Sequence, residues 1–236
     1  MDRAPAHTYL LVPASRCREE LWDTAEEEQP DAVILDIYGD EAGPEEARAA
    51  AVDWLKSVRR TRPRQVWFRV HPVSGECAAD LAAFEGLGNG VVLPEVATAR
   101  EVSWVTSLCP ATAVMPVFET HHALSRAVSI ACRPGVVRLG LSIQRIDEQL
   151  PLDVPERRDA RVWARSILVN ASAAAGLPGP VNGIHPTPED VVAVAHDAVQ
   201  AADEGFTAQC INRGWQLCEV RILRREWEAS FSGEST

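Results

Sequence analysis

Charged residues that could do chemistry lie within or just after several short apolar stretches of this sequence. They are Asp36, Arg69 with His71, Glu95 and Glu119. Carboxylates and an imidazole can exchange protons with a substrate as general acids or bases. The planar guanidinium of arginine can grip a substrate carboxylate with two hydrogen bonds, and glutamate oxygens suit a hard cation such as Mg²⁺. These residue types predict a site that binds a small acid or carbonyl compound and moves protons on it.

Further polar residues stand near the ends of the same or later apolar stretches, and most of them also have a structural interpretation. They are Tyr38, His121, Gln144, Arg145, Asp147, His185 and Asn212. Asp36 could simply brace a neighbouring strand. Arg69 could be the buried partner of Glu119 or Glu95 without any ligand. The two histidines are more typical of a helix start and of a loop than of a binding site. Glu119, which closes the fifth apolar stretch, is the centre of the functional interpretation.

The apolar stretches have the length and composition of buried strands, and segments with helical spacing follow them. The predicted strands are Tyr9–Pro13, Ala32–Tyr38, Gln65–His71, Gly90–Glu95, Ala113–Glu119, Val136–Leu141, Pro180–Ile184 and Phe206–Ile211. The predicted helices are Ala14–Glu28, Glu45–Arg60, Asp80–Phe84, Thr98–Leu108, Ala123–Ala131, Arg157–Gly176, Thr187–Gly205 and Gly214–Ala229. The polar segment Ser142–Glu156 predicts a long irregular loop.

Eight strand and helix units in series predict an α/β fold, a single (β/α)₈ barrel domain over residues 1–229 with a flexible tail at 230–236. An open doubly wound sheet is the competing fold. That fold would need a glycine-rich first turn, and Val12–Ser15 contains no glycine. In a barrel the carboxyl ends of all strands share one face, so the charged residues at the strand ends would meet there.

Composition excludes several functional classes. The chain has 236 residues, a net charge of −11 and an isoelectric point near 5.0, so nucleic acid and anionic membranes are poor partners. Lys56 is the only lysine and lies in a pattern typical of a solvent-facing helix position, which argues against a Schiff-base mechanism. The cysteines show no zinc-binding spacing. No apolar stretch suits a signal peptide or a membrane span, so we expect a cytoplasmic protein.

Several short motifs, in series over residues 9 to 212, resemble the citrate lyase beta-subunit-like branch of the HpcH/HpaI aldolase family. They are Tyr9–Pro13, Asp31–Asp36, Phe68–Pro72 with Ala79–Leu81, Val92–Val96, Phe118–Thr120 and Gly205–Phe206. The resemblance implies a (β/α)₈ barrel, commonly a trimer, that makes or breaks a carbon–carbon bond next to a carbonyl with Mg²⁺. Many members act on acyl-CoA thioesters. By this resemblance Arg69 would hold a substrate carboxylate or carbonyl, and Glu119 would be a Mg²⁺ ligand.

The sequence departs from the family at polar positions of the predicted site. His7 replaces an arginine before the first strand, and Ile37-Tyr38-Gly39 replaces an acidic pair. His71 stands for an asparagine, Glu95 for a lysine, Ile143 for the second metal-binding aspartate, and Ala208-Gln209 for a Gly-Lys pair. Asp147 could supply the missing metal ligand if the segment after the sixth strand folds back. The scaffold is therefore expected to persist while its chemistry is altered.

Three functions remain open from the sequence. The first is a carbon–carbon lyase or aldolase that acts on a 3-hydroxy acid or its acyl thioester through an enolate, with a rebuilt Mg²⁺ site at Glu119 and Asp147. The second is a metal-free enzyme on a small carbonyl or carboxylate substrate, in which Glu119, His71 or Glu95 serves as acid and base. The third is a non-catalytic protein that binds a small acid. In each case we expect a homo-oligomer, and a trimer by resemblance.

Overall fold

Eight parallel strands close into a barrel in the computed structural model, which describes residues 7–22, 29–57, 65–73, 75–150 and 154–222. The strands pair in chain order, and β1 pairs with β8 to close the ring. The strands are β1 Thr8–Pro13, β2 Ala32–Asp36, β3 Gln65–Arg69, β4 Gly90–Leu93, β5 Ala113–Phe118, β6 Gly140–Leu141, β7 Val181–Asn182 and β8 Ala208–Ile211. The predicted barrel is therefore confirmed. The predicted tail at 230–236 lies outside the described residues.

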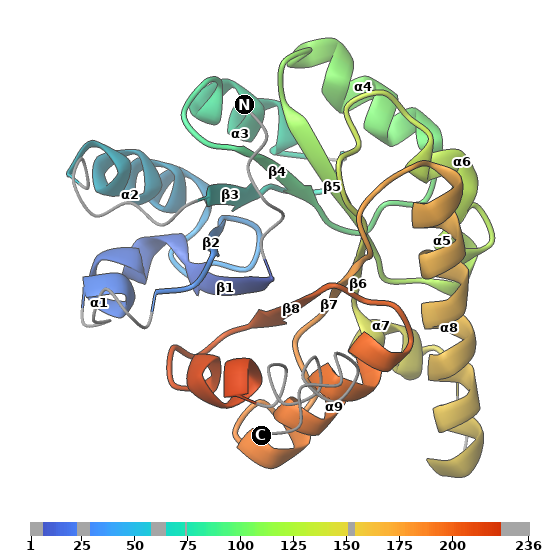
Figure 1. Cartoon of the computed structure of the whole chain (residues 1–236). Helices are drawn as coiled ribbons and strands as arrows, with labels where there is room; N and C mark the ends of the chain where they lie inside the picture. Colours follow the sequence, from blue (N-terminus) through green and yellow to red (C-terminus); the bar gives the residue numbers. More distant parts are fainter. Residues whose placement is uncertain (1–6, 23–28, 58–64, 74, 151–153, 223–236) are drawn as a thin grey trace.

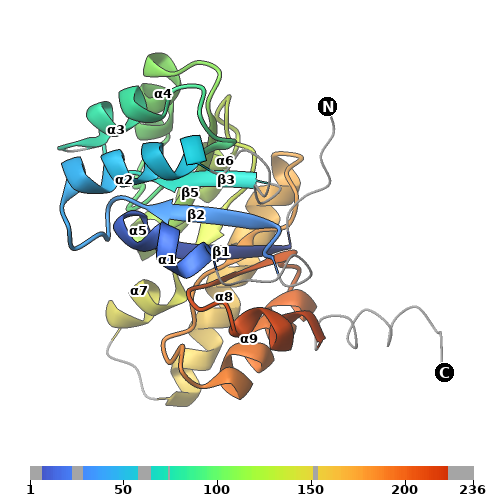
Figure 2. The ribbon, with the colours of Figure 1, turned by 90° about the vertical axis from the view of Figure 1, so that its left-hand side faces the viewer.

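Helices surround the strands (Figure 1). They are η1 Ala14–Arg16, α1 Cys17–Trp22, α2 Pro44–Ser57, α3 Cys77–Phe84, α4 Ala99–Leu108, α5 His121–Leu124, α6 Ala127–Ala131, α7 Ile143–Glu148, α8 Val154–Ala174 and α9 Val191–Asp203, and residues 216–222 are also helical. Figure 2 shows α2, α3 and α4 on one side of the strands and α7, α8 and α9 on the other. No helix among the described residues is long and apolar enough to cross a membrane.

Two elements differ from the prediction near the sixth strand. The strand is only Gly140–Leu141, and Val136 pairs with Val114 as an isolated bridge. Between them Arg138 turns its side chain into the barrel base, where it donates to the Gly179 carbonyl at 3.1 Å. The predicted loop Ser142–Glu156 contains a helix, α7, which covers part of the barrel end. Ile143 and Ile146 of α7 are 1% exposed, so burial of two isoleucines one helical turn apart drives the helix onto the core.

Alternation along the strands builds two apolar layers. Tyr9, Ile34, Trp67, Val92 and Met115 form part of the cluster inside the barrel. The side chains at the intervening positions, together with the inner faces of the helices, form a larger cluster between barrel and helices. The interior is thus a packed core, and a cavity opens at its carboxyl-terminal end.

A buried polar network joins the barrel to α8 and α9. Arg165 of α8 is 1% exposed and donates to Asp197 of α9 at 2.6 Å and to Asn182 of β7 at 3.3 Å. Asn182 in turn donates to Asp197 at 2.7 Å and to Gln209 of β8 at 2.8 Å. Both terminal nitrogens of Arg165 are paired, since Nη1 also donates to Glu204 at 3.3 Å, although its Nε has no partner among the described residues. These pairs compensate much of the cost of burying the charge, and they join both helices to the last two strands.

Candidate active site

A cavity lies at the carboxyl-terminal end of the barrel, which we call the mouth. It has a volume of about 560 Å³, and all eight strands or their following loops contribute to its wall. Its polar lining includes Arg69, Glu119, Gln144, Arg145, His185 and Asn212. Active sites of (β/α)₈ barrels lie at this end because the loops that follow the strands converge there. The mouth is therefore the candidate active site.

A charged row of three residues crosses the mouth from β2 to the end of β5. Parallel pairing places Asp36 and Arg69 as register neighbours on β2 and β3. Nη1 of Arg69 donates to Oδ2 of Asp36 at 3.0 Å, and Nη2 lies 3.9 Å from Oε1 of Glu119. The second distance is too long for a hydrogen bond, so Asp36 holds one arm of the guanidinium while the other arm faces Glu119.

Glu119 is a buried carboxyl with both positively and negatively charged neighbours. It is 6% exposed, and burial raises its pKa above the ordinary glutamate value, because the charged form loses hydration. The positive charges of Arg69 and Arg145 lower the pKa of Glu119, and the negative charge of Glu95 raises it further. A hydrogen bond from the backbone of Glu95 acts in the opposite direction and lowers this pKa. A carboxyl with a raised pKa beside a guanidinium can exchange protons at a substrate while that guanidinium binds an oxygen.

Tyr38 and Glu95 meet at the rim of the mouth. The hydroxyl of Tyr38 donates to Oε1 of Glu95 at 2.6 Å, which raises the pKa of Tyr38. Cζ of Arg69 lies 5.1 Å from the centre of the Tyr38 ring, within the range of a cation–π contact. Tyr38 thus contacts Arg69 directly, and Glu95 reaches Arg69 through its hydrogen bond with Tyr38.

His71 is held by a buried carboxylate on α3. Its backbone N–H and its ring Nδ1 lie 2.7 and 2.8 Å from Oδ2 of Asp80, which is fully buried and also accepts from Arg48 at 2.8 Å. A carboxylate can only accept, so Nδ1 carries the hydrogen and Nε2 is left as the proton acceptor. The ring packs edge-on against Tyr38, with centroids 5.5 Å apart.

Two residues of the predicted site are engaged elsewhere. Asp147, expected as a second metal ligand, accepts from Nε of Arg161 on α8 at 2.9 Å. The segment that carries it does not fold back as a loop, because it is part of α7. His121 begins α5 and stacks on Trp163 of α8, with centroids 6.0 Å apart.

Some residues of the mouth were not predicted from the sequence. Cys210 of β8 lines the cavity, and burial raises its pKa to about 12, so its thiol stays protonated and poorly nucleophilic. Ser142 and Gly183 also line the cavity. Residues two apart on a strand face the same side, so Cys210 faces the barrel interior as Ala208 does, and this spacing could have identified it. Nothing in the sequence marks the other two.

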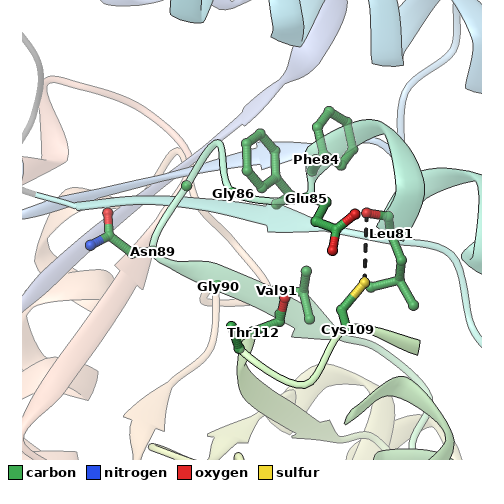
Figure 3. Close-up of a pocket in the computed structure, with 12 residues that line it drawn as sticks. Leu81, Phe84, Glu85, Gly86, Asn89, Gly90, Val91, Cys109 and Thr112 are labelled. Carbon is green, nitrogen blue, oxygen red and sulfur yellow. Dashed lines mark hydrogen bonds between the residues drawn. The ribbon is translucent and has the colours of Figure 1, made fainter. Parts of the chain in front are cut away.

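A smaller cavity lies beside the amino-terminal ends of β4 and β5. It measures about 90 Å³, and Gly90, Thr112 and Cys109 are among its lining residues (Figure 3). Sγ of Cys109 lies 3.9 Å from the Leu81 carbonyl oxygen, and burial raises the pKa of the thiol. At this end of a barrel, residues commonly serve stability, so the cavity is not the candidate site.

Comparison with known proteins supports the resemblance seen in the sequence. No family model matches the chain. The (3S)-malyl-CoA thioesterase of Cereibacter sphaeroides is 24% identical over 218 residues, which cover 90% of this chain and 75% of that protein. The citrate lyase beta subunit of Mycobacterium tuberculosis, complexed with oxaloacetate and magnesium, has a TM-score of 0.76 and 25% identity, with 93% of this chain and 97% of that chain covered.

The chain is similar in sequence and in fold to the citrate lyase beta subunit. A second structure of that protein, CitE from M. tuberculosis with magnesium, acetoacetate and coenzyme A, has a TM-score of 0.77 and 25% identity, with 99% of this chain and 90% of that chain covered. The predicted resemblance to the citrate lyase beta-subunit-like branch of the HpcH/HpaI family is thus confirmed. The relatives support a family that acts on carboxylate and acyl substrates.

Magnesium is bound in the similar M. tuberculosis structures, so we asked whether the residues of this chain could hold the same ion. Among the described residues, no group of three or more His, Cys, Asp or Glu side chains could hold a metal. Glu119 faces two arginines, the apolar Ile143 is buried at the start of α7, and Asp147 is bound to Arg161. Mg²⁺ favours several oxygen ligands, so this donor set does not fit a dedicated magnesium site.

Proposed function

We propose that the protein is a carbon–carbon lyase that cleaves a 3-hydroxy acid or its acyl thioester through an enolate, or catalyses the reverse condensation. The observation that carries the proposal is the pair Arg69 and Glu119, with a guanidinium nitrogen 3.9 Å from a buried carboxylate in the cavity at the mouth. One residue of the pair is suited to bind an oxygen anion, and the other to transfer a proton.

Arg69 is the substrate-binding residue in this proposal. Asp36 holds Nη1, which leaves Nη2 directed at the space beside Glu119. A substrate carboxylate or thioester carbonyl in that space would accept from Nη2. The charge of the arginine would then stabilise the oxygen on which negative charge develops in the transition state. Asp36 acts through Arg69 and is a positioning residue.

Glu119 is the proton-transfer residue. In the cleavage direction its carboxylate accepts the proton of the 3-hydroxyl group, the bond between C2 and C3 breaks, and C3 becomes a carbonyl. The electron pair of the broken bond forms the enolate, whose oxygen Arg69 stabilises. Return of the proton from Glu119 to C2 completes the reaction, so atoms and charge balance without a further reactant. His71, with Nε2 as acceptor, remains a second candidate base.

Replacement of Arg69 by lysine is expected to weaken the binding of a small acid roughly 10- to 100-fold, because an ammonium group cannot reproduce the planar two-pronged contact. Isothermal titration with acetoacetate or pyruvate measures this change. Arg126→Lys, on an exposed position between α5 and α6, is the matched control and should bind as the wild type does. Equal affinity of wild type and Arg69→Lys would make Arg69 a structural residue.

Magnesium is expected to bind with a dissociation constant on the order of millimolar or weaker, because a single carboxylate beside two arginines is a poor ligand set. Titration calorimetry with MgCl₂ on the wild type, Glu119→Gln and Asp147→Asn measures this affinity. Tight binding that disappears in Glu119→Gln would contradict the expectation and restore a metal-dependent mechanism.

Thioester hydrolysis is a second candidate function, favoured by the similarity to a malyl-CoA thioesterase. In that reaction Glu119 would take a proton from water as the water attacks the carbonyl that Arg69 polarises. Product analysis separates the two reactions, because hydrolysis releases a free thiol and an intact acid, whereas cleavage yields a new carbonyl compound. A protein that binds acids without converting them would be the third, non-catalytic alternative.

A further inference from the structure

Tyr38 occupies a central place at the rim of the mouth. Its ring covers the guanidinium of Arg69 at 5.1 Å on one side and meets the edge of His71 at 5.5 Å on another. Its hydroxyl donates to Glu95 at 2.6 Å. Tyr38 follows β2 and Glu95 follows β4, so this hydrogen bond spans the end of β3, from which Arg69 projects.

Glu95 reaches the other half of the site through its backbone. It provides a backbone hydrogen bond to the carboxylate of Glu119, while its own carboxylate accepts from Tyr38. Its φ of 52° is in the left-handed region, which residues with a side chain rarely adopt. Glu95 is exposed and also lines a separate cavity of about 370 Å³.

We propose that Tyr38 and Glu95 form a brace that fixes the position of Arg69 relative to Glu119. This proposal rests on the proposed function, since it assigns these two residues a role in the same site. Asp36 holds only one nitrogen of Arg69, and a single edge contact leaves the guanidinium plane free to turn. The ring of Tyr38 against its face fixes that plane. Glu95 links the ring to the backbone segment that contacts Glu119.

The charge of Glu95 gives the brace a measurable electrostatic effect. Glu119 is faced by Arg69 from β3, by Glu95 after β4 and by Arg145 from α7, and among these Glu95 alone raises its pKa. A small acid binds beside Glu119 more readily when that carboxyl is protonated. Its affinity should therefore fall as pH rises through the pKa of Glu119. Removal of the Glu95 charge should move that fall to lower pH.

Three substitutions separate the parts of the brace. Tyr38→Leu removes the ring from Arg69 and should weaken acetoacetate binding about tenfold. Tyr38→Phe keeps the ring but loses the hydrogen bond to Glu95, so it should weaken binding by a smaller factor of about threefold. Glu95→Gln keeps an acceptor for the tyrosine hydroxyl but removes the charge. It should bind with near wild-type affinity at low pH and lose affinity at a lower pH than the wild type does. Asp53→Asn, an exposed acidic position on α2, is the control for loss of one surface charge.

Isothermal titration with acetoacetate over a pH series, with a melting curve for each variant, performs the test. The brace is refuted if folded Tyr38→Leu binds like the wild type, or if Glu95→Gln leaves the pH dependence unchanged. Should Tyr38→Leu fail to fold, Glu95→Gln alone decides. Failure of the proposed function gives a different result, namely that Arg69→Lys and wild type bind alike. If pyruvate, acetoacetate and oxaloacetate all fail to bind to the wild type, both proposals are overturned.

Discussion

Replacement of Glu119 by glutamine is expected to lower the rate of carbon–carbon cleavage about 10²- to 10⁴-fold, the usual contribution of a positioned acid or base. The amide keeps the size of the side chain and its place 3.9 Å from Arg69, but it cannot accept the hydroxyl proton. Binding of a small acid should persist, because Arg69 and Asp36 are unchanged. Steady-state kinetics and calorimetry on the same preparation separate the two effects.

The pH profile adds a second criterion for Glu119. A base must be deprotonated, so activity rises as pH passes its pKa, and burial moves that rise above the range of an ordinary glutamate. The activity of Glu119→Gln should not show this rise with pH. Glu148→Gln, the same substitution on an exposed residue of α7, is the control and should keep both the wild-type rate and the rise of activity with pH. A Glu119→Gln variant with unchanged turnover would exclude Glu119 as the base.

Replacement of Arg165 by alanine is expected to lower the free energy of unfolding by about 3–5 kcal/mol, the usual cost of removing one partner of a buried ion pair. Asp197, which is 9% exposed, would then lose its ion pair and keep the hydrogen bond from Asn182. Urea denaturation of the purified variant measures the loss. The effect on the site should be indirect, through β7 and β8.

Arg161→Ala is the matched control for this loss. Arg161 lies one turn earlier on α8 and also binds an aspartate, but its side chain is 30% exposed against 1% for Arg165. Water can replace its contact in part, so the loss should be clearly smaller. Equal losses in the two variants would show that burial does not determine the strength of these pairs.

The barrel could be predicted from the sequence because its signal is local and repeated. Each strand is a short apolar run, and its helix follows at once, so eight weak signals support one fold. The meeting of Asp36, Arg69 and Glu119 follows from the same rule, since all three stand at strand ends. Arg138 shows the limit, because its turn into the barrel base depends on partners far along the chain.

The remaining features of the site depend on contacts between distant segments. A polar composition predicts a loop at Ser142–Glu156, but burial of two isoleucines makes α7, and Arg161 then captures Asp147. Tyr38 and Glu95 are separate departures from the family pattern in the sequence. They are hydrogen-bonded partners in the structure, which no local pattern could indicate.

Exchange of substrate protons with solvent tests the central claim most directly, because it reports enolate formation without requiring the full substrate. Pyruvate, acetoacetate and acetyl-CoA are incubated in D₂O with the protein, and loss of the signal of the protons next to the carbonyl is followed by NMR. The account predicts exchange with the wild type in the presence of EDTA and its loss in Glu119→Gln. Binding of these compounds without any exchange, or equal exchange in Glu119→Gln, would contradict it.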